Sequence, residues 1–396
     1  MRSQVFFLIK TGIEKWFFFA TSLFLVGYFI FPAVKQHNLF LIIGVSVPLV
    51  LMAPYFYKEM WLKNWVAVSG LVLAFYLFIN SLWSASYSLE QSLVYLRYLF
   101  FVWCLFGSIA FVQLKQPKYS EYLFRAFIIV GAVHFAFGIW EHFHIHPKAL
   151  DVRYGKRPID EATFAGMLLL ACLWLMIESR RLLHKVVIFL LSIPFIIILL
   201  IAKSRGPQLA LLVSIPLVAY FQGVKLRSFM LAVTLLLSVL ILTLLLTGAA
   251  KHIFSRGLEF PYRIGIWGAS IQQGMAYFWF GQGLSENAPL FIDDGKFTHS
   301  HNILLSIFRM GGIVGALLFI ANFILCMIAG FKQQILIHKL WVVWLCFGVL
   351  CLMTNGRYPL TRHSEIWFAY WIPIAFIAAT TPYFKLKRFS NSIQEA

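Results

Sequence analysis

Long blocks of apolar residues alternate with short polar segments along nearly the whole chain. Blocks of roughly 17–25 apolar residues have the length that a helix needs to cross a bilayer core of about 30 Å. The pattern predicts an all-α integral membrane protein of about twelve transmembrane helices, with residues 1–396 as a single polytopic membrane domain. The expected helices are 16–31, 39–56, 65–83, 93–114, 122–143, 162–178, 185–202, 207–222, 227–249, 302–330, 340–355 and 365–382.

The boundary between two of these helices is ambiguous in the sequence. Only Lys203-Ser204-Arg205-Gly206-Pro207 separates the apolar run 185–202 from the run 207–222. Both a tight turn between two helices and a single broken helix fit so short a separation.

The cations in the short loops predict the orientation. Every loop on the side of the two termini carries two or three Lys or Arg residues, as in the pairs Lys58 and Lys63, and Lys225 and Arg227. The first two loops on the other side hold only Lys35 between them. Because cytoplasmic loops are the more basic ones, we expect both termini in the cytoplasm.

Four later external loops are also basic, against this rule. Their cations include Arg153, Arg157, Arg205 and Arg263. Cations in external loops, where the positive-inside rule predicts few of them, suggest an anionic ligand. A guanidinium binds phosphate through two hydrogen bonds. Contact with anionic lipid of the outer leaflet is the alternative.

The longest external segment is the loop 250–301, between the ninth and tenth predicted helices. Pro261 has a position that a first helical turn tolerates, and Ile264, Trp267, Ile271 and Met275 recur at helical spacing. The loop is therefore expected to contain amphipathic helix that lies along the membrane surface.

Composition narrows the partners. The chain is 61% hydrophobic and 12% charged, and its net charge is +18. Membrane lipid and anionic substrates suit this excess, whereas nucleic acid does not, because the chain has no basic domain outside the membrane to hold it. The five cysteines lie inside apolar blocks and form no CxxC pair, so they are interpreted as packing residues.

His301 is the best candidate for chemistry. It belongs to Thr298-His299-Ser300-His301-Asn302, where the long loop enters a membrane helix. The positive end of the helix dipole disfavours imidazolium, so the ring stays able to accept a proton from a sugar hydroxyl. A helix-capping or interfacial histidine is the alternative. Arg205 and Arg263 are the candidates for neutralising a diphosphate.

Two other groups of residues suggest metal chemistry only at first sight. His142, His144 and His146 alternate, but they end a predicted helix, and a polar interfacial collar explains them better. Asp293-Asp294 could accompany a metal-bound diphosphate, but no D-x-D motif is present. No metal and no cofactor are therefore expected.

Three motifs give the stretch from about 186 to 320 a resemblance to the O-antigen ligase and polymerase superfamily. Arg205 and Leu209 fit the Arg-x3-Leu pattern of the ligases. Arg263-Ile264-Gly265-Ile266-Trp267 is followed by Gly281-Gln282-Gly283. His301-Asn302, nine residues, Gly312, two residues and Gly315 resemble the ligase signature of His-Asn, nine residues and Gly-x-x-Gly.

The resemblance implies a glycosyltransferase. Its family moves a glycan from an undecaprenyl diphosphate carrier to a sugar hydroxyl of lipid A-core, on the periplasmic face of the inner membrane, without a metal. By this resemblance Arg205 and Arg263 would hold the diphosphate, His301 would be the catalytic base, and the protein would lie in a bacterial, Gram-negative inner membrane. Arg153 and Arg157 are further candidates for anion binding because they lie in a basic external loop, and attack opposite the diphosphate would invert the anomeric centre.

Two alternatives remain. An O-antigen or other polysaccharide polymerase would use the same donor, but the His-Asn spacing favours a ligase. A transporter of lipid-linked glycan would need carboxylates in mid-membrane, whereas acidic residues such as Glu178 and Glu365 lie at helix ends.

Overall fold

The computed structural model describes residues 2–31, 34–51, 64–84, 87–144, 158–202, 204–225, 227, 260–285, 290–292, 295–297 and 299–381. The longer helices are α1 (Arg2–Val26), α2 (Val34–Phe40), α4 (Trp65–Asn80), α5 (Leu89–Lys115), α6 (Tyr119–His144), α7 (Pro158–Glu178), α8 (Leu182–Ile201), α9 (Arg205–Phe221), α12 (Phe260–Ala276), α13 (Ile303–Phe331), α14 (Leu340–Asn355) and α15 (Ile372–Thr380). Short helical turns are η1 (Gly27–Phe29), η2 (Leu41–Ser46), η3 (Ser81–Trp83), η4 (Leu336–Lys339) and η5 (Trp367–Trp371).

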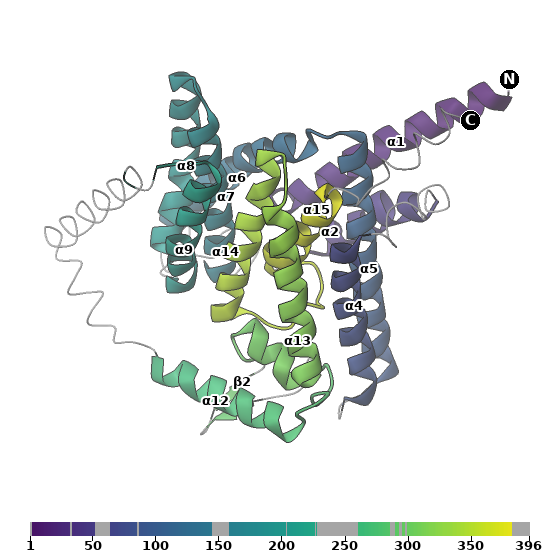
Figure 1. Cartoon of the computed structure of the whole chain (residues 1–396), viewed down its shortest axis with the longest axis vertical. Helices are drawn as coiled ribbons and strands as arrows, with labels where there is room; N and C mark the ends of the chain where they lie inside the picture. The colour runs from purple at the N-terminus through teal and green to yellow at the C-terminus, as the bar shows by residue number, and fades with distance from the viewer. Residues whose placement is uncertain are drawn as a thin grey trace, which may run out of the picture.

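The described helices form one bundle (Figure 1), and the predicted all-α membrane class is confirmed. Seven of those described are long and apolar enough to cross a membrane, and three shorter apolar helices accompany them. The expected helix 227–249 lies outside the described residues, so the total of about twelve stays a prediction. The ambiguous separation near position 204 is a turn between two helices, because α8 ends at Ile201 and α9 begins at Arg205.

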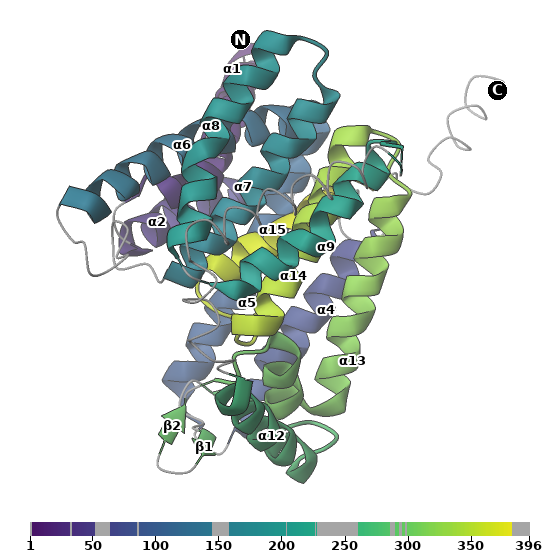
Figure 2. The ribbon, with the colours of Figure 1, turned by 90° about the vertical axis from the view of Figure 1, so that its left-hand side faces the viewer.

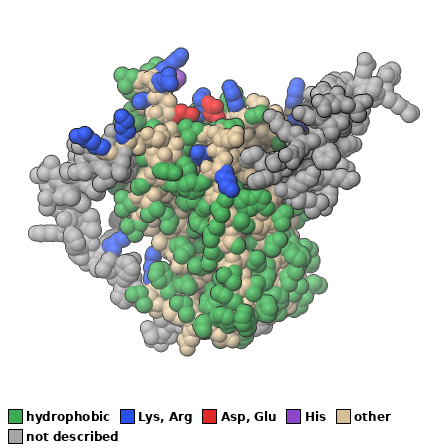
Figure 3. All heavy atoms as spheres, in the orientation of Figure 1, with side chains coloured by type: hydrophobic (Ala, Val, Ile, Leu, Met, Phe, Trp, Pro, Cys, Tyr) green, Lys and Arg blue, Asp and Glu red, His purple; other side chains and the backbone are tan. Residues whose placement is uncertain are grey.

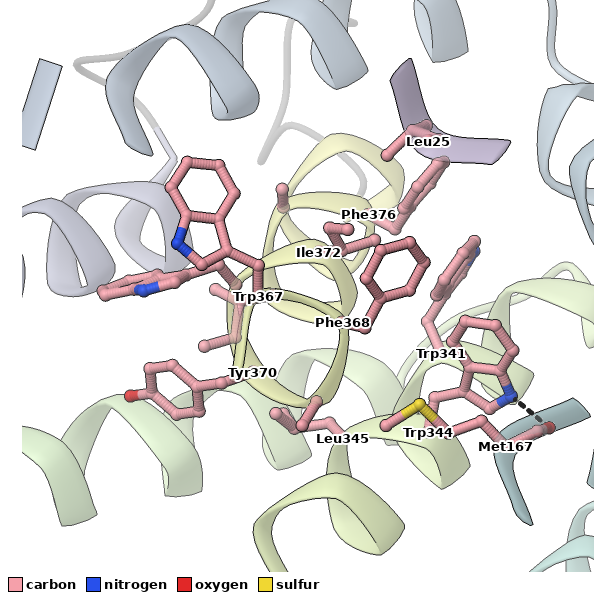
Figure 4. Packing of buried hydrophobic residues seen from close by; sticks show 14 of the residues in the cluster. Leu25, Met167, Trp341, Trp344, Leu345, Trp367, Phe368, Tyr370, Ile372 and Phe376 are labelled. Atoms are coloured by element: carbon pink, nitrogen blue, oxygen red, sulfur yellow. Dashed lines mark hydrogen bonds between the residues drawn. The ribbon is translucent and has the colours of Figure 1, made fainter. Parts of the chain in front are cut away.

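Aromatic side chains fill the core around α14 and α15, which other helices surround (Figures 1 and 4). Trp341 stacks on Phe376 with ring centroids 3.9 Å apart. The indole of Trp341 donates to Ser120 Oγ at 3.0 Å, and that of Trp344 donates to the Met167 carbonyl at 2.9 Å. A buried indole N–H needs such an acceptor, so these bonds fix which helices meet here.

The outer surface is apolar over a broad area. Figure 3 shows hydrophobic side chains over the middle and lower part of one face, with most of the visible Lys and Arg toward the top. On α13 the exposed residues Leu317, Ile320 and Ile324 recur at helical spacing. Such an exposed stripe on a long apolar helix is the surface that lipid covers, which makes this a multi-pass membrane protein.

Helices α9, α13 and α14 share the same two ends. Phe221 at the end of α9 contacts Phe331 at the end of α13, and Lys339 before α14 lies over the Phe221 ring at 5.4 Å. At the other end, the start of α9 packs against the end of α14. Gly206 is so close to Thr354 that a Cβ on Gly206 would overlap its side chain. The short polar segments near Arg205, His301 and Asn355 are therefore gathered at one end of the bundle.

Helix α13 is broken at Gly312, where φ is 63° and ψ is −166°. The chain segment after α12 fills the break: Gln282 N donates to the Arg309 carbonyl at 3.1 Å, and Ile313 N donates to the Phe278 carbonyl at 2.8 Å. Gly281 also has a positive φ, of 69°, and a Cβ there would meet the Met310 backbone. Gly281 of the Gly281-Gln282-Gly283 motif and Gly312 of the His-Asn motif are thus needed because the two backbones touch there.

The described part of the long loop packs at the same end. Helix α12 has the predicted position, and it is followed by a short antiparallel hairpin of β1 (Leu290–Ile292) and β2 (Gly295–Phe297), in which Leu290 pairs with Phe297. Figure 2 shows α12 and the hairpin together below α13. Asp293 and Asp294 lie outside the described residues.

Candidate functional site

His301 sits directly before the helix that its motif predicted. Asn302 is the N-cap of α13, and its side chain accepts from Leu305 N at 3.1 Å. His301 itself has a φ of 49°, and it is the only non-glycine residue with a positive φ in the described part of the chain. A left-handed histidine costs backbone energy, and such residues cluster at functional sites.

The imidazole of His301 is oriented by α14. Its Nδ1 lies 3.1 Å from Oδ1 of Asn355, the last residue of that helix. An amide oxygen only accepts, so Nδ1 carries the proton and the lone pair of the neutral ring is at Nε2. The ring is half-buried and lies over His299, with centroids 4.0 Å apart. This geometry suits a general base whose tautomer is fixed by a neighbour.

Small residues hold the three helix ends together around this pair. A Cβ on Gly356 would contact Ile303, the first residue of α13. Gly206, the second residue of α9, lies directly against Thr354. Arg205 is therefore placed beside the Thr354-Asn355 end of α14, which holds His301.

Neither Arg205 nor Arg263 makes an ion pair or hydrogen bond with any residue that the structure describes. Arg205 is exposed, and Arg263 is half-buried on α12. Arg263 shares a helix face with the buried Ile266 and Ser270, the face that α12 turns toward the protein. Both guanidinium groups are thus available to an anion at this end of the bundle.

A buried polar contact adjacent to this end was missed by the sequence reasoning. Arg309 on α13 is 1% exposed, and its Nη1 donates to Gln273 Oε1 of α12 at 3.4 Å. Tyr358, three residues beyond Asn355, is close enough to interact electrostatically with Arg309. An arginine inside the predicted span 302–330 was the available signal, because charges inside membrane helices mark functional or structural polar contacts.

The remaining predicted residues are less informative. Arg153, Arg157 and His146 lie outside the described residues. His142 and His144 are in the last turn of α6, as expected, and His144 Nδ1 bonds to the Trp140 carbonyl at 2.9 Å. Among the described residues, no three His, Cys, Asp or Glu side chains gather as metal ligands would.

A second histidine pair lies in the loop that follows Asn355. His363 meets the ring of His37 edge-on, with centroids 4.3 Å apart. Burial, together with the nearby His37 and Arg362, holds the pKa of His363 well below its ordinary value. His363 is therefore neutral at pH 7 and contributes packing at this end of the bundle.

Together these features define a multi-pass, predominantly helical membrane protein with a histidine and two available arginines at one end of its bundle. Residues 189–320 match the family model described as O-antigen ligase. Over 132 residues the chain is 32% identical to an O-antigen ligase of Pseudomonas aeruginosa strain PAO1. That alignment covers 32% of this chain and 32% of the relative's length. Residues 189–320, which include Arg205, Arg263 and His301, are thus similar to the O-antigen ligase family, and the predicted resemblance is confirmed over that stretch.

Proposed function

We propose that this protein ligates O-antigen polysaccharide from undecaprenyl diphosphate onto lipid A-core, at the periplasmic face of the inner membrane. The observation that carries the proposal is the hydrogen bond from His301 Nδ1 to Asn355 Oδ1, next to the helix end that bears Arg205. The family match over residues 189–320 supports the same activity.

In the proposed reaction, a hydroxyl oxygen of the acceptor sugar attacks the anomeric carbon of the donor. The hydroxyl proton passes to Nε2 of His301, while the bond from the anomeric carbon to the diphosphate breaks and undecaprenyl diphosphate leaves. Attack opposite the leaving group inverts the anomeric centre. Asn355 keeps the His301 lone pair directed at the acceptor, and general-base help of this kind contributes about 10²–10⁴-fold in rate.

Arg205 and Arg263 are assigned to the diphosphate, with Arg153 and Arg157 as further candidates. Charge grows on the leaving group as the bond breaks, so cations placed in advance stabilise the transition state more than the ground state. The absence of internal partners for Arg205 and Arg263 among the described residues supports this assignment. Because a diphosphate is a good leaving group, the scheme needs no metal.

The lipopolysaccharide of cells that lack the protein tests the proposed activity. Lipid A-core without polymer, with full-length O-antigen accumulating on its lipid carrier, is expected of a missing ligase. Lipid A-core bearing a single repeat unit would identify a polymerase instead. Purified protein with lipid-linked glycan and lipid A-core should remain active in EDTA, and restoration by a divalent ion after loss in EDTA would contradict the metal-free scheme.

Cysteine accessibility tests the proposed orientation. Glu90, at the start of α5, and Lys225, after α9, are both exposed. In intact cells with a permeable outer membrane, an impermeant maleimide should label Glu90→Cys and not Lys225→Cys. Labelling of Lys225→Cys alone would place the His301 end in the cytoplasm.

A further inference from the structure

Helix α12 has three different faces. Ile266, Ser270 and Gly274 are buried, and a Cβ on Gly274 would meet Phe308 of α13, so this face packs on the protein. Gln272 and Ala276 are exposed on a second face. Between these faces runs a third, which we call the apolar face (Ile264, Ile271, Met275), with 59%, 46% and 57% of each side chain exposed.

The chain then continues into an aromatic segment (Tyr277, Phe278, Trp279, Phe280) whose side chains are all exposed, Trp279 by 65%. Its backbone is nevertheless fixed. The carbonyls of Phe278 and Trp279 accept from Ile313 N and Val314 N at 2.8 and 3.3 Å, and the Phe280 carbonyl accepts from Asn80 Nδ2 at 2.7 Å. The segment is therefore held rigidly while it presents large apolar rings outward.

The aromatic segment is attached where two exposed membrane surfaces end. On α13, the exposed stripe begins at Leu317, directly after the residues that bond the segment. On α4, the exposed residues Val72 and Phe75 lead to Trp83, whose ring meets Phe280 edge-on at 6.4 Å. The apolar surface thus continues from both membrane helices onto the aromatic segment and α12.

Lipid is the occupant that this continuity favours. The apolar face and the aromatic segment contain no charged residue, and α12 carries no acidic residue. Aromatic rings concentrate at the level where acyl chains meet headgroups, and a helix with one exposed apolar face lies along that boundary. A second copy of the chain is the competing occupant.

From these observations we infer that the apolar face of α12 and the aromatic segment are inserted in the lipid leaflet at the His301 end, and anchor the site to the membrane surface. Arg263 lies on the protein-facing side of the same helix, so the anchor holds its guanidinium at headgroup height, facing inward. The inference concerns lipid contact and holds whichever glycan or acceptor the enzyme uses.

Nitroxide labels on the full-length protein in phosphatidylcholine–phosphatidylglycerol liposomes test the anchor. Met275→Cys and Ile271→Cys report on the apolar face, and Gln272→Cys is the matched control on the same helix. Ile324→Cys, on the exposed stripe of α13, gives the reference accessibility of a label that contacts lipid. Oxygen concentrates among acyl chains, whereas a nickel chelate stays in water. A label in lipid therefore collides more with oxygen than with nickel, and we expect the ratio of oxygen accessibility to nickel accessibility to be severalfold higher at positions 275 and 271 than at 272. Unsubstituted protein measures the background from the five native cysteines, four of which are buried.

Two results would overturn the inference. A ratio at 275 and 271 as low as at 272 would put the apolar face in water. Low accessibility to both oxygen and nickel would mean that protein, such as a second copy of the chain, covers it. Only labelled variants that elute from gel filtration at the same volume are compared. The accessibility ratios at 275 and 271 must both be high for the inference to hold.

Discussion

The two ends of α14 differ in how their polar groups are satisfied. At the Trp341–Trp344 end, both indoles are fully buried and both donate to fixed acceptors, Ser120 Oγ and the Met167 carbonyl. At the Asn355 end, the neighbouring Arg205 is exposed and makes no ion pair or hydrogen bond with any described residue, while His301 has a left-handed backbone.

This difference separates residues that determine the fold from residues that can serve a ligand. In a membrane interior every polar group needs an internal partner, so the first end is rigid and tolerates little change. Polar groups that retain bonding capacity at a helix end are available to substrate instead. Substitutions at the two ends should therefore affect different quantities, stability at one and transfer at the other.

The largest expected effect is on transfer, at the Asn355 end. His301→Ala removes the proposed base, so ligation by purified protein should fall by about 10²–10⁴-fold, below detection in most assays. Binding of the lipid-linked donor should change little. His144→Ala, which removes an exposed histidine of α6, is the control and should be fully active. Undiminished ligation by His301→Ala would leave orientation and charge neutralisation as the whole of catalysis.

The next effect is structural but close to the site. Gly312→Ala puts a Cβ against the Trp279 backbone at a residue with φ of 63°, so we expect a loss of more than about 2 kcal/mol in the free energy of unfolding. Thermal unfolding in detergent measures it. Gly268→Ala has open space around its Cβ and should be neutral. Equal stability of the two variants would mean that α13 is not broken at Gly312.

The helix positions were predictable because a membrane span is a local property of the sequence. The block 302–330 predicted α13 almost to the residue. The role of Gly312 was not predictable, since the need for glycine arises from contact with Trp279, which lies far away in the chain. The nine-residue spacing in the His-Asn motif acquires a physical reason only when that contact is seen.

The same distinction applies to the site. His301 could be proposed from its place at a helix start, and Arg205 and Arg263 from their place in basic external loops and from resemblance. The partner of His301 could not, because Asn355 is 54 positions away and looks like an ordinary helix end. For α12, the predicted spacing correctly indicated an amphipathic helix, but only packing reveals that Arg263 faces the protein while Ile271 and Met275 are exposed.

A smaller loss of glycan transfer is expected when Arg205 is replaced by a residue that keeps the positive charge but lacks the planar guanidinium. Arg205→Lys retains a cation and removes the planar fork that grips a phosphate, so turnover should fall by about 10–100-fold, with unchanged thermal unfolding. Arg362→Lys, an exposed residue outside the matched range 189–320, should lose less than about twofold. Equal losses in the two variants would favour general contact with anionic lipid over a diphosphate site at Arg205.

The smallest effect lies at the other end of α14. Trp344→Phe keeps an aromatic ring against Phe127 and removes the hydrogen bond to the Met167 carbonyl, which should cost about 1 kcal/mol of unfolding free energy. Because Trp344 lies about three helical turns along α14 from Asn355, the KM and kcat of ligation should stay at the unsubstituted values. Trp16→Phe, at an exposed indole, controls for the loss of an indole as such and should not change stability. If Trp344→Phe lowered kcat without lowering stability, the two ends of α14 would be coupled, and the separation between folding and ligand-binding residues would fail.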